Sequence, residues 1–221
     1  MFAAKRLGKE LVKVKFHMLP NPTTPRHTCH NLLDKPRDVL PAQQKLPPGI
    51  ELVKADDFRE WLVDIQVLDA NPLYMNQVFR LSFLFSDSYP IEAPEVVFIK
   101  VSPSATDPAK PQQQQSQSQS QSPTPFPGRP IPIHPHIYSN GIICLDLLGS
   151  VGWSPVQSVE SVCMSLQSML TGNTKNQRPP GDEQFCQSMG VRGPDGWSGY
   201  RGGGRGRGLR DVRFAYDDDS V

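Results

Sequence analysis

Two short runs, at 61–68 and 79–85, place apolar residues at every second position, and a third run, Val96–Val101, is almost entirely apolar; this pattern restricts the possible fold most strongly. A period of two is typical of strands with one buried face. Prolines 90 and 94 lie between the second and third runs, where they suit a rigid connection and not a central strand. The runs therefore predict a three-stranded antiparallel meander. The apolar faces of the first two strands are Trp61, Val63, Ile65 and Val67, and Phe79, Leu81, Phe83 and Phe85.

Two segments outside these runs have helical periodicity. Downstream of the strands, Ser154 and Gln157 are placed to form a capping box around Pro155, and the helix is expected to end at Gly172. Cys163 lies on its apolar face and is interpreted as core packing. Near the N-terminus a basic amphipathic helix is predicted, with an apolar face made of Ala4, Leu7, Leu11 and Val14. Strands followed by helices predict the α+β class.

Two stretches are too polar or too proline-rich to pack in a core. Residues 19–46 contain five prolines, and residues 102–128 contain a repeat of Gln and Ser, so both are interpreted as flexible insertions. Residues 189–221 are rich in Gly and Arg and end in an acidic cluster, which predicts a solvated tail. Residues 1–188 therefore form one predicted domain.

Charge and cysteine content limit the classes of partner and compartment. The net charge of +1 creates no global field that would hold a nucleic acid or an anionic membrane. No apolar run is long enough for a signal sequence or a membrane span. The cysteines have no C-x-x-C spacing, which indicates a reducing compartment, cytoplasm or nucleus. They are Cys29, Cys144, Cys163 and Cys186.

Residues 131–148 form a segment dense in turn-forming residues and are expected to be irregular. Cys144 lies within it among turn residues and not on an apolar stripe, which favours a reactive thiol over a core thiol. No metal site is expected, because neither set of nearby ligand atoms has a complete four-ligand spacing. These sets are His134, His136 and Cys144, and His27, Cys29 and His30.

The order of helix, meander, irregular cysteine segment and helix resembles that of the ubiquitin-conjugating (UBC) enzyme family. Cys144 follows His136 by eight residues, as the family cysteine follows the last residue of its His-Pro-Asn motif. The resemblance covers about residues 3–16, 47–101 and 129–186. Its motifs are His134-Pro135-His136, Ser139-Asn140-Gly141, Cys144-Leu145-Asp146, Tyr89-Pro90 with Pro94, and Trp153-Ser154-Pro155.

This resemblance implies the UBC fold and a conjugating activity. Cys144 would accept ubiquitin as a thioester from an activating enzyme and transfer it to a protein amine. His136 stands where the family has the Asn that helps stabilise the oxyanion, and His134, Asn140 and Asp146 would support the site. No bound cofactor is expected, since the activating enzyme consumes the ATP.

The same resemblance implies four kinds of partner: ubiquitin, an activating enzyme, a ligase of the RING type and protein substrates. Ile91 and Val156 depart from the common family pattern and leave the choice of ligase open, and the lysines fit a solvated surface equally well. The implied ligase-binding residues are Lys5, Arg6, Lys9, Ile91, Ser154, Pro155 and Val156.

Three features are similar to the W-type members, which modify the N-termini of substrates: the His-Pro-His motif, Arg178-Pro179-Pro180, and the aromatic-then-acidic ending. Residues 175–178 also lack the acids of lysine-directed members, which favours an α-amine acceptor. Asp146 points to the alternative, an ordinary lysine-directed enzyme. A non-catalytic ubiquitin-binding scaffold, a related modifier, and RNA binding through residues 201–208 are further alternatives.

Overall fold

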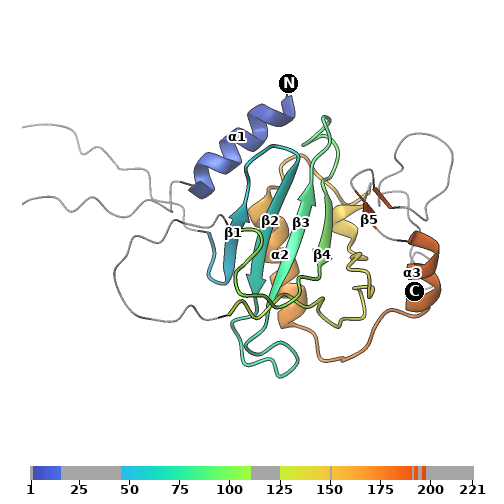
Figure 1. Cartoon of the computed structure of the whole chain (residues 1–221). Helices are drawn as coiled ribbons and strands as arrows, with labels where there is room; N and C mark the ends of the chain where they lie inside the picture. Colours follow the sequence, from blue (N-terminus) through green and yellow to red (C-terminus); the bar gives the residue numbers. More distant parts are fainter. Residues whose placement is uncertain are drawn as a thin grey trace, which may run out of the picture.

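An antiparallel sheet lies at the centre of the computed structural model, which describes residues 2–15, 46–110, 125–149, 151–190, 192–193 and 196–197 (Figure 1). The register opposes Trp61 to Phe83, and Phe83 to Val96, so large apolar residues align across the strands. The predicted meander is confirmed. The strands, in spatial order, are β1 (Ile50–Lys54), β2 (Glu60–Gln66), β3 (Val78–Leu84) and β4 (Glu95–Ile99).

The sheet has four strands and not the predicted three, because β1 adds to the edge beside β2. Strand β1 pairs with β2 through Ile50 opposite Ile65 and Leu52 opposite Val63, with an irregularity before Lys54. Only two apolar residues alternate in this five-residue strand. Such a short edge strand gives too weak a period to be identified without its partner.

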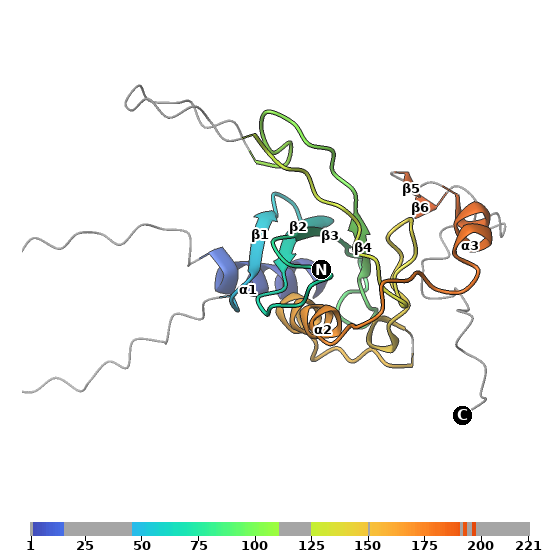
Figure 2. The same cartoon turned by 90° about the horizontal axis from the view of Figure 1, so that it is seen from below.

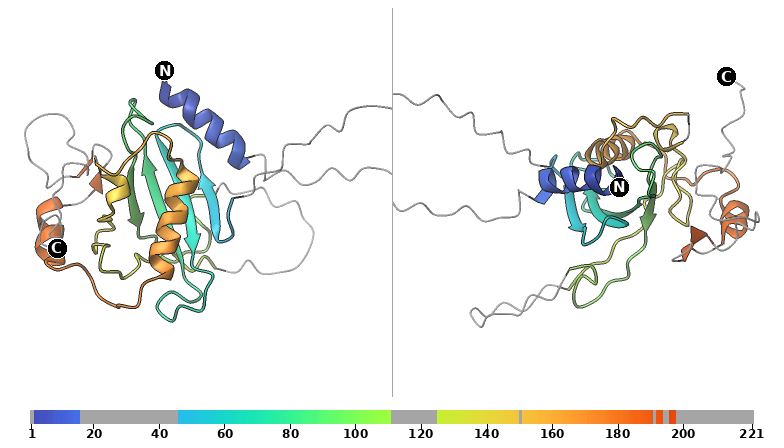
Figure 3. Two further views of the ribbon diagram at one scale, coloured as in Figure 1. Left: turned by 180° about the vertical axis from the view of Figure 1, so that it is seen from behind. Right: turned by 90° about the horizontal axis from the view of Figure 1, so that it is seen from above.

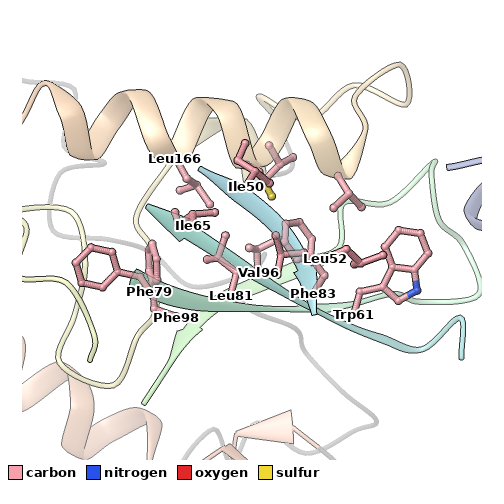
Figure 4. Close-up of a cluster of buried hydrophobic side chains, with 14 of the residues drawn as sticks. Ile50, Leu52, Trp61, Ile65, Phe79, Leu81, Phe83, Val96, Phe98 and Leu166 are labelled. Carbon is pink, nitrogen blue, oxygen red and sulfur yellow. The ribbon is translucent and has the colours of Figure 1, made fainter. Parts of the chain in front are cut away.

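Helix α2 (Val159–Thr171) lies across one face of the sheet (Figure 3). Leu166 is completely buried against the apolar side chains of the strands (Figure 4). Cys163 is also completely buried, which confirms its interpretation as core packing, and burial raises the pKa of its thiol. The remaining buried residues of the helix are Val159, Val162 and Leu170.

The start of α2 differs from the prediction. The helix begins at Val159, and its capping box is made by Ser158 and Ser161, one turn after the predicted Ser154 and Gln157. Gln157 instead closes a turn, since its N–H donates to the carbonyl of Ser154 over 2.9 Å. Ser158 and Ser154 are both residue types that favour an N-cap, so the sequence alone does not separate the two starts. The predicted end at Gly172 is confirmed.

Helix α1 (Phe2–Lys15) packs on the core through Leu7 and Leu11, as predicted, but its buried face is turned slightly from the predicted one. Ala3 and Leu7 are buried, whereas Ala4 is exposed. Glu10 is also buried, because its carboxylate accepts hydrogen bonds from Arg6, from the Tyr89 hydroxyl and from the Val159 N–H at the start of α2. These four residues, the Glu10 cluster, hold α1 against α2 by polar contacts that an apolar period does not reveal.

The sheet face opposite α2 contains a buried ionic cluster that the sequence reading missed. Arg80 is 1% exposed and donates to Asp64 over 2.7 Å and to Asp107 over 2.7 Å. Arg129 pairs with Asp64 over 2.8 Å and lies 4.6 Å from the centroid of the Phe126 ring. Arg80 holds the pKa of Asp107 down at about 2. In the sequence, Arg80 alternates with apolar residues and is therefore expected to face solvent. The structure encloses it, and its charge is paired.

This cluster also corrects the predicted insertion at 102–128. Backbone bridges pair Val101 with Arg129 at the ends of the predicted insertion and Ser104 with Phe126 within it. Residues 111–124 and nearly all of the other predicted insertion, 19–46, lie outside the described residues. The described parts of the 102–128 segment belong to the fold because Asp107 supplies a counter-ion to Arg80.

Helix α3 (Asp182–Met189) lies beyond the β4 edge, with part of residues 131–148 between it and the sheet (Figure 2). The predicted solvated tail began at Met189, but this residue is 3% exposed and closes the helix. Residues 192–193 (β5) and 196–197 (β6) pair with each other, and residues 198–221 lie outside the described part. No helix in the described part of the chain is both long and apolar enough to cross a membrane.

Candidate active site

Cys144 lies at the end of a tight hairpin, residues 136–144, which we call the cysteine hairpin. Its two sides are joined by the Cys144 N–H, which donates to the His136 carbonyl over 2.8 Å, and by the Tyr138 N–H, which donates to Ile142 over 2.9 Å. The turn contains Gly141 at a φ of 91°, where an added Cβ would lie 1.8 Å from the Phe98 carbonyl oxygen. Only glycine fits this contact with β4.

Cys144 is 8% exposed and belongs to a second buried cluster, separate from the core under α2. The sequence reading favoured a reactive thiol over a buried one, and the structure shows that this thiol is largely enclosed. The other members of the second cluster are Val97, Tyr138, Ile142 and Met189, with Ile99, Phe185 and Cys186 packed against it.

His134 links the hairpin to helix α2. Its imidazole hydrogen-bonds the backbone of Met169, and its Nδ1 accepts from the His136 N–H over 2.9 Å. Burial, with a contribution from the neighbouring His136, lowers the pKa of His134 to about 4. His134 is therefore neutral at physiological pH, and its hydrogen bonds connect the backbone at His136 to α2.

The other predicted site residues lie near the hairpin. His136 is exposed at its end, opposite Cys144, and its ring is 5.4 Å from that of His134. Asn140 supports the turn, since its Oδ1 accepts from the Ile142 N–H over 3.2 Å. Asp146 is exposed at the start of a short 3-10 helix, η1 (Asp146–Leu148), directly after the cysteine segment.

Arg178 has a structural role beside the cysteine hairpin that the sequence did not reveal. Its Nη1 donates to the carbonyls of Pro132 over 2.6 Å and Ile137 over 3.0 Å, and its Nη2 donates to that of Ile131 over 3.3 Å. The half-buried guanidinium therefore binds the chain leading into the hairpin, and desolvation lowers its pKa. The motif Arg178-Pro179-Pro180 gave no indication of these contacts, because the carbonyls that accept from Arg178 lie more than 40 positions earlier in the chain.

A second contact supports the same segment from the β2–β3 connection. The Tyr74 hydroxyl donates to the Ile133 carbonyl over 2.7 Å and accepts a hydrogen bond from Asn173. These partners lie far apart in the sequence, so no local pattern could have identified them.

The predicted ligase-binding residues gather at one end of the molecule. The Trp153 indole N–H donates to the Pro90 carbonyl over 2.8 Å, which joins the turn containing Ile91 to the loop containing Val156. Arg6 ties α1 to this loop by donating to the Gln157 carbonyl over 3.0 Å. Ile91 and Val156 are 74% and 81% exposed; Lys5, Lys9 and Pro155 are exposed, and Ser154 is partly buried.

Arg6 is the exception among these residues. It is engaged with Glu10 and Gln157, so its first role is to hold α1 in place.

Metal ligation has no geometric support among the described residues, which contain no group of three potential ligands. His27, Cys29 and His30 lie outside that part of the chain.

Comparison with known proteins places this geometry in a family. Residues 35–192 match the family described as ubiquitin-conjugating enzyme. A probable ubiquitin-conjugating enzyme E2 W from Dictyostelium discoideum is 31% identical over 84% of this chain and 93% of its own length. A ubiquitin-conjugating enzyme E2 W from Caenorhabditis elegans is 34% identical over 69% of this chain and 82% of its own.

A solved structure agrees with both relatives. The ubiquitin-conjugating enzyme E2 UbcA1 from Agrocybe aegerita superposes with a TM-score of 0.56 at 31% identity, covering 88% of this chain and 96% of that one. Membership implies ubiquitin, an activating enzyme and a ligase as partners. The chain belongs to the ubiquitin-conjugating enzyme family, is itself such an enzyme, and lies close to the W-type members.

Proposed function

We propose that Cys144 carries ubiquitin as a thioester and transfers it to the α-amine at the N-terminus of a protein substrate. The position of Cys144 in the cysteine hairpin supports the first part, because its backbone is held by His136 and hence, through His134, by α2. A fixed backbone limits the positions that the sulfur can take relative to an incoming thioester.

The chemistry is two acyl transfers. The Cys144 thiolate attacks the carbonyl carbon of ubiquitin on the activating enzyme, a new C–S bond forms, and the cysteine of that enzyme leaves as a thiolate. A substrate amine then attacks the same carbonyl, the C–S bond breaks, the nitrogen loses a proton, and the Cys144 thiolate is released. The exposed imidazole of His136 is the proposed donor to the oxyanion of this second step.

The assignment of Cys144 is tested by its replacement with serine. The wild-type adduct should be cleaved by thiol reductant, whereas Cys144→Ser should form an oxygen ester that survives it. Cys186→Ser is the matched control, because Cys186 packs against the same cluster and should be dispensable for charging. An adduct that persists in Cys144→Ala would overturn the assignment, and running the assay with related modifiers identifies the one accepted.

The preference for an α-amine is supported by the charges near the site. Lys175 is exposed after α2, and residues 174–178 contain no carboxylate that would attract and deprotonate a lysine. A lysine has a pKa of about 10.4, against about 8 for an α-amine, so its deprotonation costs roughly 3.5 kcal/mol more. The relatives named E2 W favour the same proposal. The exposed Asp146, two residues after Cys144, favours the lysine-directed alternative.

Two peptides separate these alternatives. One is N-acetylated with a free lysine, and the other has a free N-terminus and no lysine. Charged enzyme should discharge faster onto the second peptide. Faster discharge onto the acetylated peptide would contradict the preference, and Asp146→Asn would then show whether that carboxylate is the cause.

We also propose that the ligase is of the RING type and binds across Ile91 and Val156. Both are strongly exposed apolar side chains on loops joined by Trp153. Ile91→Ala should abolish most of the ligase-stimulated discharge and leave spontaneous discharge unchanged. Leu68→Ala is the control, because Leu68 is 57% exposed just after β2 and outside this surface. Equal loss in both variants would refute the assignment.

A further inference from the structure

Helix α3 rests on the cysteine hairpin. Phe185 stacks on Tyr138, with ring centroids 3.9 Å apart and planes inclined by 24°. The Asp182 carboxylate accepts the Ser139 N–H over 2.7 Å, and the Cys186 sulfur lies 3.2 Å from the Ser139 hydroxyl. The helix therefore runs along the hairpin from its turn.

The far end of α3 belongs to the same buried cluster as Cys144. Met189 is the one residue of the helix that is buried, and it lies in the second cluster with Cys144. Phe185 and Cys186 pack against that cluster from the same helix. The low exposure of Cys144, 8%, thus depends in part on a helix that is docked through a few side chains.

Glycines bracket the helix on both sides. Gly181 precedes it at a φ of 70° and Gly190 follows it at a φ of 69°. A Cβ added at Gly181 would meet nothing closer than Gln184 at 3.9 Å, so the backbone conformation, and not crowding, is what favours glycine there. Glycine also changes its backbone angles at low cost, which suits a hinge.

Enclosure of Cys144 conflicts with the proposed chemistry. Its sulfur must approach the carbonyl carbon of a thioester to about 3 to 3.5 Å, and the chain that carries this carbonyl must reach the sulfur. A residue that is 8% exposed within an apolar cluster leaves little room for such an approach. Helix α2 cannot move without opening the core, whereas α3 can move with the loss of one buried side chain, Met189, and a few contacts with the hairpin.

We propose that α3 is a hinged cover over Cys144, and that its Met189 end moves away before the thiol reacts. The cover protects the thiol between cycles and makes the charging rate depend on how often α3 opens. The charging part of this inference rests on the proposed role of Cys144, whereas the movement of α3 does not.

A reversible crosslink tests the cover. In Ser139→Cys the new sulfur would lie near that of Cys186, since the present Oγ–Sγ distance is 3.2 Å. Oxidised glutathione would remove the two thiol hydrogens to form a disulfide and would itself be reduced to two molecules of glutathione. Peptide mapping verifies the pairing, and circular dichroism verifies the fold.

The readout is the rate at which iodoacetamide alkylates Cys144, measured by mass spectrometry of its peptide. Crosslinked protein should react at least about tenfold more slowly than the same protein after reduction and removal of the reductant. Ser139→Ala treated in the same way should show no change. Cys163, completely buried under α2, serves as an internal monitor and should remain unmodified in every form.

Met189→Ala gives the opposite change. It should accelerate alkylation of Cys144 about three- to tenfold while Cys163 stays protected.

Equal alkylation rates in the crosslinked and reduced forms would overturn the cover. If the crosslink slows alkylation but neither form accepts ubiquitin, the cover stands and the thioester assignment fails. If both forms accept ubiquitin on Cys144 at the same rate, the cover is wrong and the thioester assignment stands.

Discussion

Helices α2 and α3 lie on either side of residues 172–181, yet they are attached to the molecule in different ways. Helix α2 buries five of its thirteen residues and has a capping box at its start. Glu10 binds its first N–H, and Asn71 binds the carbonyls of Leu170 and Thr171 at its end. Helix α3 buries one of eight residues, and Gly181 provides no side-chain cap.

This difference shows that two consecutive helices have different roles: α2 stabilises the core, and α3 is attached weakly enough to move. The sheet and α2 share a core, so neither is stable without the other. Helix α3 adds little burial to the whole and covers a reactive group. A helix that must be released repeatedly is expected to be attached weakly.

The largest predicted effect is a difference in unfolding free energy between a variant of α2 and a variant of α3. Leu166→Ala removes a completely buried side chain and should lower the free energy of unfolding by about 4 kcal/mol. Met189→Ala should lower it by less than about 1 kcal/mol, because α3 detaches before the core unfolds. Urea denaturation followed by tryptophan fluorescence measures both values, and equal losses would show that α3 belongs to the core.

The second prediction concerns the link between α2 and the hairpin through His134. Its pKa is about 4 when folded, against about 6.5 when unfolded, so the unfolded chain binds a proton first as the pH falls. The contribution of His134 is complete above about pH 6.5 and is lost as the pH falls towards 4. At pH 5.0 the loss should be about 2 kcal/mol.

Urea denaturation at pH 8.0 and pH 5.0 checks this effect. His134→Gln keeps an amide donor and acceptor but does not titrate, so its stability should change less between the two pH values. The same pH dependence in both proteins would assign the effect to other groups.

The third prediction concerns Arg178, which lies in the segment between α2 and α3. Arg178→Ala removes three hydrogen bonds to the chain before the hairpin and should cost about 2 kcal/mol. Single-turnover discharge should slow about tenfold, and the hairpin amides should exchange faster with deuterium. Arg178→Lys keeps the charge without the planar fork of donors, so it should remain impaired. Full recovery by lysine would show that charge alone matters.

The smallest effect should come from α3 itself. Asp182→Asn weakens the contact with the Ser139 N–H and should change the global stability by less than about 1 kcal/mol. Alkylation of Cys144 should still rise about two- to threefold, because the cover opens more often. Glu183→Gln, in the same turn but exposed, should leave the alkylation rate unchanged. A rise in both variants would indicate a general charge effect.

The sequence by itself determined the parts whose signal is local. The alternation in 61–67 and 79–85 identified β2 and β3, and the helical period from Val159 to Leu170 identified α2, because neighbouring residues on one face bury together. The spacing between His136 and Cys144 identified the family. The helix start was predicted one turn too early, because Ser154 satisfies the local rules for an N-cap as Ser158 does.

Only the tertiary structure decided which charged residues are enclosed and what covers the cysteine. Arg80 reads as solvent-facing until Asp107, 27 positions later, meets it, and no local pattern shows that Arg178 binds the carbonyls of Pro132 and Ile137. Met189 reads as the start of a tail, although it packs in the cluster of Cys144. These contacts join residues far apart in the chain, so burial and hydrogen bonding at each one depend on the folded arrangement and not on neighbours in the sequence.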